Sequence, residues 1–193
     1  MSALLGKQDF IDAYNDGKWI DWIDEVSGNT ATTQKYSLSV SSGTEKTKLF
    51  ASTSYNREEG LLNNENLNRY SLRLNLDQQI FSWAKVGFTS NLVYRDLNSG
   101  VKNTFTKSLS AIPLGDASTE KGEINHEYIT GQYSPMSDFI ENQYVDNTRS
   151  TYLNVSGYVE LTPVKDLTFT SRVNGTLNHS RRGQYWGEKC NAN

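Results

Sequence analysis

Apolar and polar side chains alternate strictly through residues 69–77. Tyr70, Leu72, Leu74 and Leu76 are apolar, and the residues between them are polar. A period of two predicts a β-strand with one apolar face and one polar face. Similar alternation recurs along the chain, and together these segments predict an all-β, antiparallel fold with strands near 34–42, 47–57, 69–78, 85–95, 149–161 and 167–178.

The connections between the predicted strands alternate between short and long. Short turns near 43–46, 79–84 and 162–166 alternate with loops at 58–68 and 96–148, and the second loop contains one predicted short helix. In an up-and-down sheet every second connection lies at the same end, so both loops are expected at one end. Long unstructured loops are uncommon in compact soluble domains, whereas outer-membrane barrels combine short periplasmic turns with long extracellular loops. The alternation therefore favours a section of a transmembrane β-barrel.

Aromatic residues mark both ends of the predicted apolar face. Tyr55, Tyr70 and Tyr94 lie near the long-loop ends of their strands, and Phe81 and Trp83 lie at the short-turn end. Membrane barrels carry aromatic girdles of this kind at both lipid–water interfaces. These positions predict that the apolar face contacts lipid.

The polar face supplies the candidate binding residues. Tyr152 and Tyr158 share its parity and are expected to point into the lumen of a barrel. Amide and guanidinium groups on the same face could bond sugar hydroxyls or peptide groups, although a polar wall facing water or a plug is the preferred interpretation of any single one. The predicted substrate-binding residues are Arg73, Asn75, Asn91, Asn154, Arg172 and Asn174.

Residues 8–26 differ from the rest, because their apolar residues recur at helical intervals. Gly17 in the middle predicts two short helical turns instead of one helix. Acidic residues fill the intervals, but the glycine and the bidentate glutamate of a calcium loop are missing. A solvated acidic surface is the preferred interpretation of Asp12, Asp16, Asp21, Asp24 and Glu25.

Composition narrows the class of protein. The 193 residues are 36% hydrophobic, and no segment approaches the roughly 18 apolar residues of a membrane helix. Such a composition still permits a barrel, whose strands are only half apolar. The net charge is -3 with scattered basic residues, which gives nucleic-acid binding no support. The single Cys190 predicts no internal disulfide, and no secretory signal pattern is recognisable.

Catalytic and metal chemistry find no support in the residue pattern. His126 and His179 are far apart, and neither has a companion at ligand spacing. The chain has no nucleophile-elbow, Walker or dinucleotide-binding glycine pattern. We expect a protein that is not an enzyme, with no catalytic residue, no cofactor and no metal site.

Several motifs occur in a consistent order that resembles one family. The motifs are Asp21-Trp22-x-Asp24, the segments 36–46, 54–60 and 68–77, Trp83-x-Lys85-Val86-Gly87, and Ala111-Ile112-Pro113-Leu114. In this order they resemble the N-terminal part of the barrel in SusC/RagA-type TonB-dependent outer-membrane transporters. The resemblance is closest over residues 20–115 and looser over 149–178.

The resemblance implies a barrel of about 22 strands with a plugged lumen, of which this chain would supply about six. It implies import of oligosaccharides or peptides together with a SusD-like surface lipoprotein, with energy delivered through the TonB complex. The location would be the outer membrane of a Gram-negative, Bacteroidetes-type cell envelope. Outer-membrane lipid is then an expected partner, and nucleic acid is not.

Departures from the family pattern predict that the chain is a fragment. No plug domain or TonB box is recognisable. Residues 1–33 would form a short helical or irregular lead-in after the plug, residues 34–182 part of the barrel, and residues 183–193 a truncated loop. Two strand edges would remain unpaired, so this stretch is not expected to transport a substrate alone.

A second class of protein remains open. A soluble or secreted antiparallel β-sandwich that binds carbohydrate would also explain the alternation, the aromatic residues and the lack of catalytic motifs. Sandwiches show no systematic alternation of short and long connections, which favours the barrel.

Overall fold

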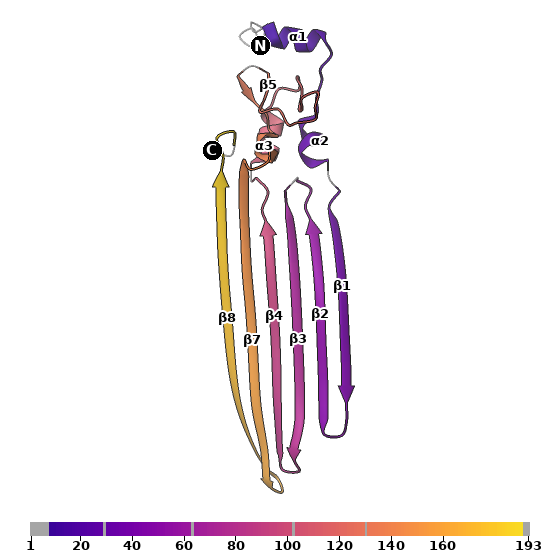
Figure 1. The fold of residues 1–193 in the computed structure, drawn as a ribbon, viewed down its shortest axis with the longest axis vertical. Coiled ribbons are helices and arrows are strands. Elements are labelled where there is room, and N and C mark those ends of the chain that lie inside the picture. Colours follow the sequence, from indigo (N-terminus) through magenta and orange to yellow (C-terminus); the bar gives the residue numbers. More distant parts are fainter. Residues whose placement is uncertain (1–7, 29, 63, 102, 130, 191–193) are drawn as a thin grey trace.

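The computed structural model describes residues 8–28, 30–62, 64–101, 103–129 and 131–190. Figure 1 shows long strands running side by side in one sheet, with the helices gathered at one end. The long strands are β1 (Thr32–Gly43), β2 (Thr47–Glu59), β3 (Asn66–Phe81), β4 (Ala84–Asn98), β7 (Tyr144–Val164) and β8 (Leu167–Trp186). The short elements are α1 (Gln8–Asn15), α2 (Trp22–Ser27), α3 (Thr104–Ser110), β5 (Glu127–Ile129), β6 (Gln132–Tyr133) and the 3-10 helix η1 (Ser137–Phe139).

The six long strands form one antiparallel sheet in the order β1-β2-β3-β4-β7-β8. Each strand therefore pairs with its neighbour along the sheet, and β1 and β8 are the two open edges. The predicted all-β antiparallel architecture is confirmed. The alternative of a β-sandwich is wrong for the described residues, because their only other sheet is the small β5-β6 pair and no second layer covers the long strands.

Short and long connections lie at opposite ends of the sheet, as the alternation of lengths predicts (Figure 1). The short turns span residues 44–46, 82–83 and 165–166, and the loops span residues 60–65 and 99–143. In the first turn, the backbone N–H of Thr47 donates to Thr44 Oγ1 at 3.0 Å. The third turn places Asp166 at a φ of 63°, a conformation that aspartate tolerates better than most residues.

Strand register places the apolar residues of neighbouring strands on one face. Tyr36 lies opposite Tyr55, Tyr55 opposite Tyr70, and Tyr70 opposite Tyr94. Two residues further along, the same face carries Leu38 on β1, Leu72 on β3 and Leu92 on β4, with Thr53 between the first two on β2. The sheet therefore has one apolar and one polar face along its length.

The strands at the long-loop end are longer than the alternation predicts. β4 continues to Asn98 and β7 begins at Tyr144, so the long loop spans 99–143 and not the predicted 96–148. Asn147 Nδ2 donates to Asn98 Oδ1 at 2.7 Å and to Asp96 Oδ1 at 2.6 Å. Side-chain bonds across the strands thus continue the sheet where no apolar alternation marks it.

β8 is extended in the same way. It reaches Trp186, beyond the predicted end at 178, so the first residues of the predicted truncated loop 183–193 belong to the strand. Arg182 and Gln184, near the end of β8, both donate to the carboxylate of Asp146 on β7. The longer strand follows from this polar pairing.

A small head packs at the long-loop end from segments far apart in sequence. It combines α1 and α2 with the long loop that carries α3 and η1 (Figure 1). Trp22 Nε1 donates to the backbone oxygen of Ile112 at 2.8 Å, and the backbone N–H of Ile112 donates to Tyr128 Oη at 3.1 Å. The rings of Trp22 and Tyr128 lie 4.8 Å apart. The chain's principal hydrophobic cluster is therefore in the head and not between sheets.

The N-terminal segment forms two short helices, as Gly17 predicts. Gly17 adopts a φ of 68°, which ends α1 and turns the chain towards α2. Asp21 caps α2 by accepting from the backbone N–H groups of Ile23 and Asp24 at 2.9 and 3.3 Å. At least this one of the clustered carboxylates therefore has a structural role.

No helix among the described residues is long and apolar enough to cross a membrane.

Candidate functional site

The polar face of the sheet is the candidate site, because it brings together the predicted side chains from four strands, β3, β4, β7 and β8. Arg73, Asn91 and Asn154 lie in one row across β3, β4 and β7. Asn75 and Asn174 belong to the next row, which crosses from β3 to β8. All of these, and Arg172 on β8, lie on the face that the alternation predicts. Their role in binding stays a prediction.

These predicted residues include some that already have partners. Asn154 Nδ2 donates to Thr176 Oγ1 at 2.9 Å across β7 and β8. The Arg172 guanidinium lies 5.5 Å from the centre of the Tyr158 ring. Arg73 is exposed on the polar face. The face thus mixes residues fixed by neighbours with residues whose polar groups are open to a ligand.

A cluster around Tyr158 fixes the short-turn half of the polar face. Tyr158 Oη donates to Asp77 Oδ1 at 2.6 Å, across the intervening strand β4. Lys85 Nζ lies 5.6 Å from the ring centre, a distance at which a cation is attracted to an aromatic face. The ring crosses Gly87, where any Cβ would overlap it. Parity predicts the polar-face position of Tyr158, but only the register reveals its partners.

An ion pair between Asp146 on β7 and Arg182 on β8 fixes the long-loop end of the polar face. Asp146 is only 3% exposed. Arg182 Nε donates to its Oδ1 at 2.7 Å, and Arg182 Nη2 contacts its Oδ2 at 2.5 Å. A bidentate pair of this kind holds both side chains in one orientation. The prediction placed Asp146 in the long loop, so this pair could not be anticipated from the sequence.

The opposite face is apolar and largely exposed. Leu38 and Leu72 leave 66% and 49% of their surface accessible. The ring centres of Tyr36 and Tyr55 are 6.4 Å apart, those of Tyr55 and Tyr70 5.0 Å, and those of Tyr70 and Tyr94 6.2 Å. A continuous row of tyrosines, which we call the tyrosine row, therefore crosses β1 to β4 on this face.

A second aromatic pair lies at the short-turn end. The rings of Phe81 and Trp83 stack with their centres 5.3 Å apart. Eleven positions separate Tyr70 from Phe81 along β3, which is about 37 Å at a rise of about 3.4 Å per residue. A strand tilted by about 45° would cover about 26 Å of height, close to the roughly 25 Å apolar band of outer-membrane barrels.

The tyrosine row also marks the point where the apolar face becomes polar. Two residues beyond Tyr94 towards the long loops, Asp96 Oδ2 lies 3.3 Å from Arg149 Nε. Tyr55 Oη itself donates to Asn68 Oδ1 at 2.8 Å. A phenol ring with its hydroxyl at a polar boundary is typical of tyrosines at a membrane interface.

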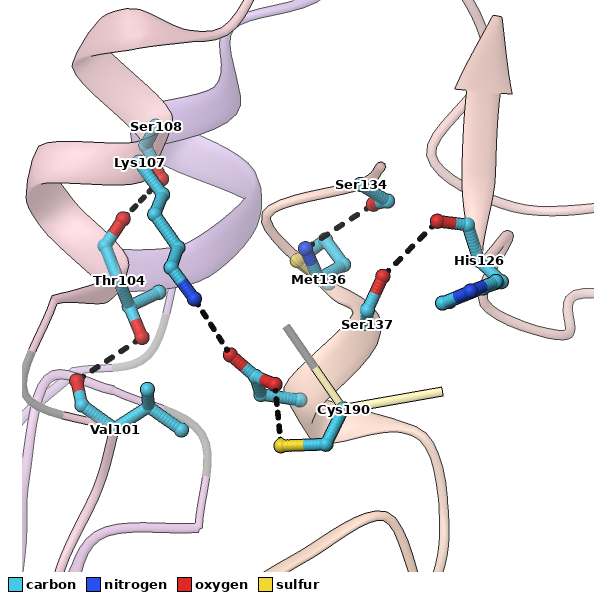
Figure 2. A network of polar contacts seen from close by, with 10 residues as sticks. Val101, Thr104, Lys107, Ser108, His126, Ser134, Met136, Ser137 and Cys190 are labelled. Carbon is cyan, nitrogen blue, oxygen red and sulfur yellow. Dashed lines mark hydrogen bonds and ion pairs between the residues drawn. The ribbon is translucent and has the colours of Figure 1, made fainter. Parts of the chain in front are cut away.

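The head contains a buried carboxylate, and Figure 2 shows Lys107, Thr104 and Cys190 from its surroundings. Asp138 is fully buried, Lys107 Nζ lies 3.6 Å from its Oδ2, and Cys190 Sγ donates to its Oδ1 at 3.0 Å. Thr104 Oγ1 donates to the backbone oxygen of Val101 at 3.0 Å, at the start of α3. The contacts join α3, η1 and the segment after β8, which gives the cluster a structural role.

The two histidines lie in different parts of the structure. His126 is in the head, where its backbone oxygen accepts from Ser137 Oγ (Figure 2). His179 lies on the apolar face of β8, opposite Thr151. Within the part of the chain that the structure describes, no three histidine, cysteine or acidic side chains group closely enough to hold a metal ion.

A single-layer, up-and-down sheet with one apolar and one polar face has the architecture of a section of β-barrel wall. No protein-family model matches the chain. The TonB-dependent receptor P26 of Formosa agariphila is 25% identical over 169 residues, which cover 86% of this chain and 17% of that protein. The comparison confirms the resemblance to TonB-dependent transporters that the sequence motifs indicate.

Solved structures of the RagAB peptide importer share the fold. The closed-closed state matches 86% of this chain and 20% of the solved chain, with a TM-score of 0.68 and 24% identity. The open-open state matches 86% of this chain and 19% of the solved chain, with a TM-score of 0.69 and 24% identity. This chain therefore spans about a fifth of the length of the proteins it resembles, and corresponds to a fragment of them.

Proposed function

We propose that this chain forms part of the barrel wall of an outer-membrane TonB-dependent importer, with its apolar face towards lipid and its polar face towards the lumen. The observation that supports this most strongly is the apolar face bounded by the tyrosine row and by Phe81 and Trp83. The height between these aromatic groups fits the apolar band of such barrels. An exposed apolar face of this extent would be a liability in water.

The whole transporter would be a barrel of about 22 strands with a plugged lumen. The open edges β1 and β8 would pair with further strands of that barrel, since unpaired backbone groups are not tolerated in lipid. In this proposal the division into a lead-in (1–33), a partial barrel (34–182) and a following loop (183–193) is kept, with β8 reaching Trp186. The head would lie on the extracellular side.

The cargo of the transporter would be an oligosaccharide or a peptide, taken up together with a SusD-like lipoprotein and driven through the TonB complex. The name of the RagAB peptide importer supports the peptide alternative by similarity. Arg73, Asn75, Asn91, Asn154, Arg172 and Asn174 would contact the cargo from the wall. One named relative is a receptor and the other is an importer, so we assign no enzymatic activity to this chain.

The orientation is testable with a matched pair of cysteine variants in the protein as its native gene encodes it, in a background with Cys190→Ser and no other cysteine. Lys121 is exposed in the long loop, and Lys165 is exposed in the third short turn. We expect a membrane-impermeant maleimide to label Lys121→Cys on intact cells. Lys165→Cys should react only after the outer membrane is permeabilised. Equal labelling of both variants on intact cells, or labelling of neither before cell lysis, would contradict the proposed location.

A further inference from the structure

The polar face is basic, although the chain as a whole has a net charge of -3. It carries eight basic and four acidic side chains, as the strand register assigns them. Three of the four acids are already bonded, Asp77 by Tyr158, Asp146 by Arg182 and Glu58 by Asn56. The basic excess therefore remains available to something outside the sheet.

The excess concentrates in one row near the long-loop end. Lys35 on β1 lies opposite Asn56, Asn56 opposite Arg69 on β3, and Arg69 opposite Arg95 on β4. We call Lys35, Arg69 and Arg95 the cationic row. All three side chains are exposed, and none makes a hydrogen bond or ion pair with another residue in the described ranges.

Arg69 and Arg95 are direct cross-strand neighbours on the same face. Like charges in this arrangement destabilise an antiparallel pair. The tyrosines that flank them, Tyr70 and Tyr94, face the other side of the sheet and cannot reduce the repulsion. An anion between the two guanidinium groups would do so.

A concavity lies beside Lys35 and Arg69 of the cationic row, and Arg95, opposite Arg69 on β4, does not line it. It has a volume of about 220 Å³ and is lined by Lys35, Ser54, Asn56, Arg69 and Ser71. That volume holds several water molecules at about 30 Å³ each, so it can accept a small charged group with part of its hydration. Every lining residue can donate a hydrogen bond and none is a carboxylate.

The nearest acid on the polar face is Glu58, which lies two residues beyond Asn56 along β2, towards the head. Asn56 Nδ2 donates to Glu58 Oε1 at 2.6 Å, so the carboxylate is held by the amide. Glu58 does not line the concavity. The basic character of the cationic row is therefore not neutralised within the described chain.

We propose that the cationic row binds an oxyanion group of the transported molecule, a carboxylate or a sulfate. Arginine guanidinium groups bind such groups through two parallel hydrogen bonds. Ser54 and Ser71 would add hydroxyl donors from the row below. The proposal rests on the proposed function, because it requires the polar face to line the path of the cargo, and it narrows the cargo to acidic oligosaccharides or acidic peptides.

The test is a binding titration of the native protein, purified in detergent, with four probes. These are a sulfated oligosaccharide, its desulfated form, a glutamate-rich peptide and its glutamine counterpart. We expect at least one anionic probe to bind more tightly than its neutral form. Tighter binding of the sulfated than of the desulfated oligosaccharide would identify a sulfate as the oxyanion. Tighter binding of the glutamate-rich peptide than of its glutamine counterpart would identify a carboxylate.

Two double variants assign the effect to the cationic row. Arg69→Gln/Arg95→Gln should weaken binding of the anionic probe by about tenfold or more, the scale of one lost hydrogen bond to a charged group. Arg57→Gln/Arg181→Gln removes the same charge near the same end of the sheet from the opposite face. That control should bind the probe as the unmodified protein does.

Three results would overturn the proposal. They are binding of no probe by the unmodified protein, equal binding of charged and neutral probes, and equal loss in both double variants. An acidic surface of the same protein covering the cationic row would give the first of these. The maleimide labelling at Lys121 and Lys165 is independent of these outcomes, so failure of this site is distinguishable from failure of the proposed location.

Discussion

Gly87 lies beneath the Tyr158 ring in the middle of the sheet, where a side chain has no room. A Cβ at this position would overlap the ring and come within 2.7 Å of Asp77 Oδ1. A ring laid across a glycine covers backbone that the glycine leaves bare. The sequence shows a glycine in a strand but not the tyrosine that requires it.

We expect Gly87→Ala to displace the Tyr158 ring and break its bond to Asp77. Overpacking of this kind costs about 1–3 kcal/mol. The measurement is urea unfolding of the native protein in detergent, followed by tryptophan fluorescence. Gly175→Ala is the matched control, because no heavy atom lies within 4 Å of a Cβ added there. Equal destabilisation by the two substitutions would contradict the close contact.

Tyr128 is buried in the head, and burial raises the pKa of its phenol group. A tyrosine in the unfolded chain ionises near pH 10. Above that pH the unfolded state loses the proton first, so the folded state binds more protons and its stability falls as the pH rises. The contribution is complete below about pH 10 and is lost as the pH rises through the folded-state pKa.

Stability of the native protein should therefore decline above about pH 10, measured by urea unfolding at stepped pH. Tyr128→Phe loses the bond from Ile112 but also loses the ionisation. This variant should start less stable at pH 8 and decline less steeply. A decline of equal slope in both proteins would show that Tyr128 does not contribute to it.

Among the elements, the strands were the most predictable part of the fold, and their ends the least. Strict alternation marks β3, where Leu72, Leu74 and Leu76 share the apolar face. The ends of β4 and β7 depend instead on polar pairs such as Asn98 and Asn147, which carry no periodic signal. Alternation also assigns polar-face residues correctly by parity, including those of the cationic row.

The head could not be predicted from sequence, because its contacts join distant segments. Trp22 and Ile112 are separated by 90 positions, and one hydrogen bond connects them. Each stands in a motif that contributed to the family resemblance, Asp21-Trp22-x-Asp24 and Ala111-Ile112-Pro113-Leu114. The structure gives these motifs a common physical role, which is to close the head over the long-loop end.

The apolar face of β3 should tolerate charge according to depth in the membrane. Leu74 lies between Tyr70 and Phe81, close to the middle of the apolar band. We expect Leu74→Arg to cost about 2–4 kcal/mol and Tyr70→Arg about 0–1 kcal/mol, as charges do at the midplane and interface of membrane barrels. Unfolding of the native protein from lipid vesicles in urea measures both. Equal costs at the two positions would argue against a lipid-facing band.

At the scale of the whole molecule, the sheet separates chemical environments by face. The apolar face ends at the tyrosine row, beyond which Arg149 and Asp96 pair. The polar face keeps its bonded clusters at Tyr158 and Asp146 and leaves the cationic row open. The head caps only the long-loop end (Figure 1). These features together are what the proposed wall between lipid and a polar passage requires.

The central claim is that adjacent residues of β3 face lipid and lumen, and Leu74 and Asn75 test it at one depth. Each would be changed to cysteine in the native protein in its membrane, in a background with Cys190→Ser and no other cysteine. Leu74→Cys should react with a maleimide dissolved in the lipid and resist a charged, water-soluble one. Asn75→Cys should show the reverse. Reaction of both cysteines with the water-soluble reagent at equal rates would contradict the account.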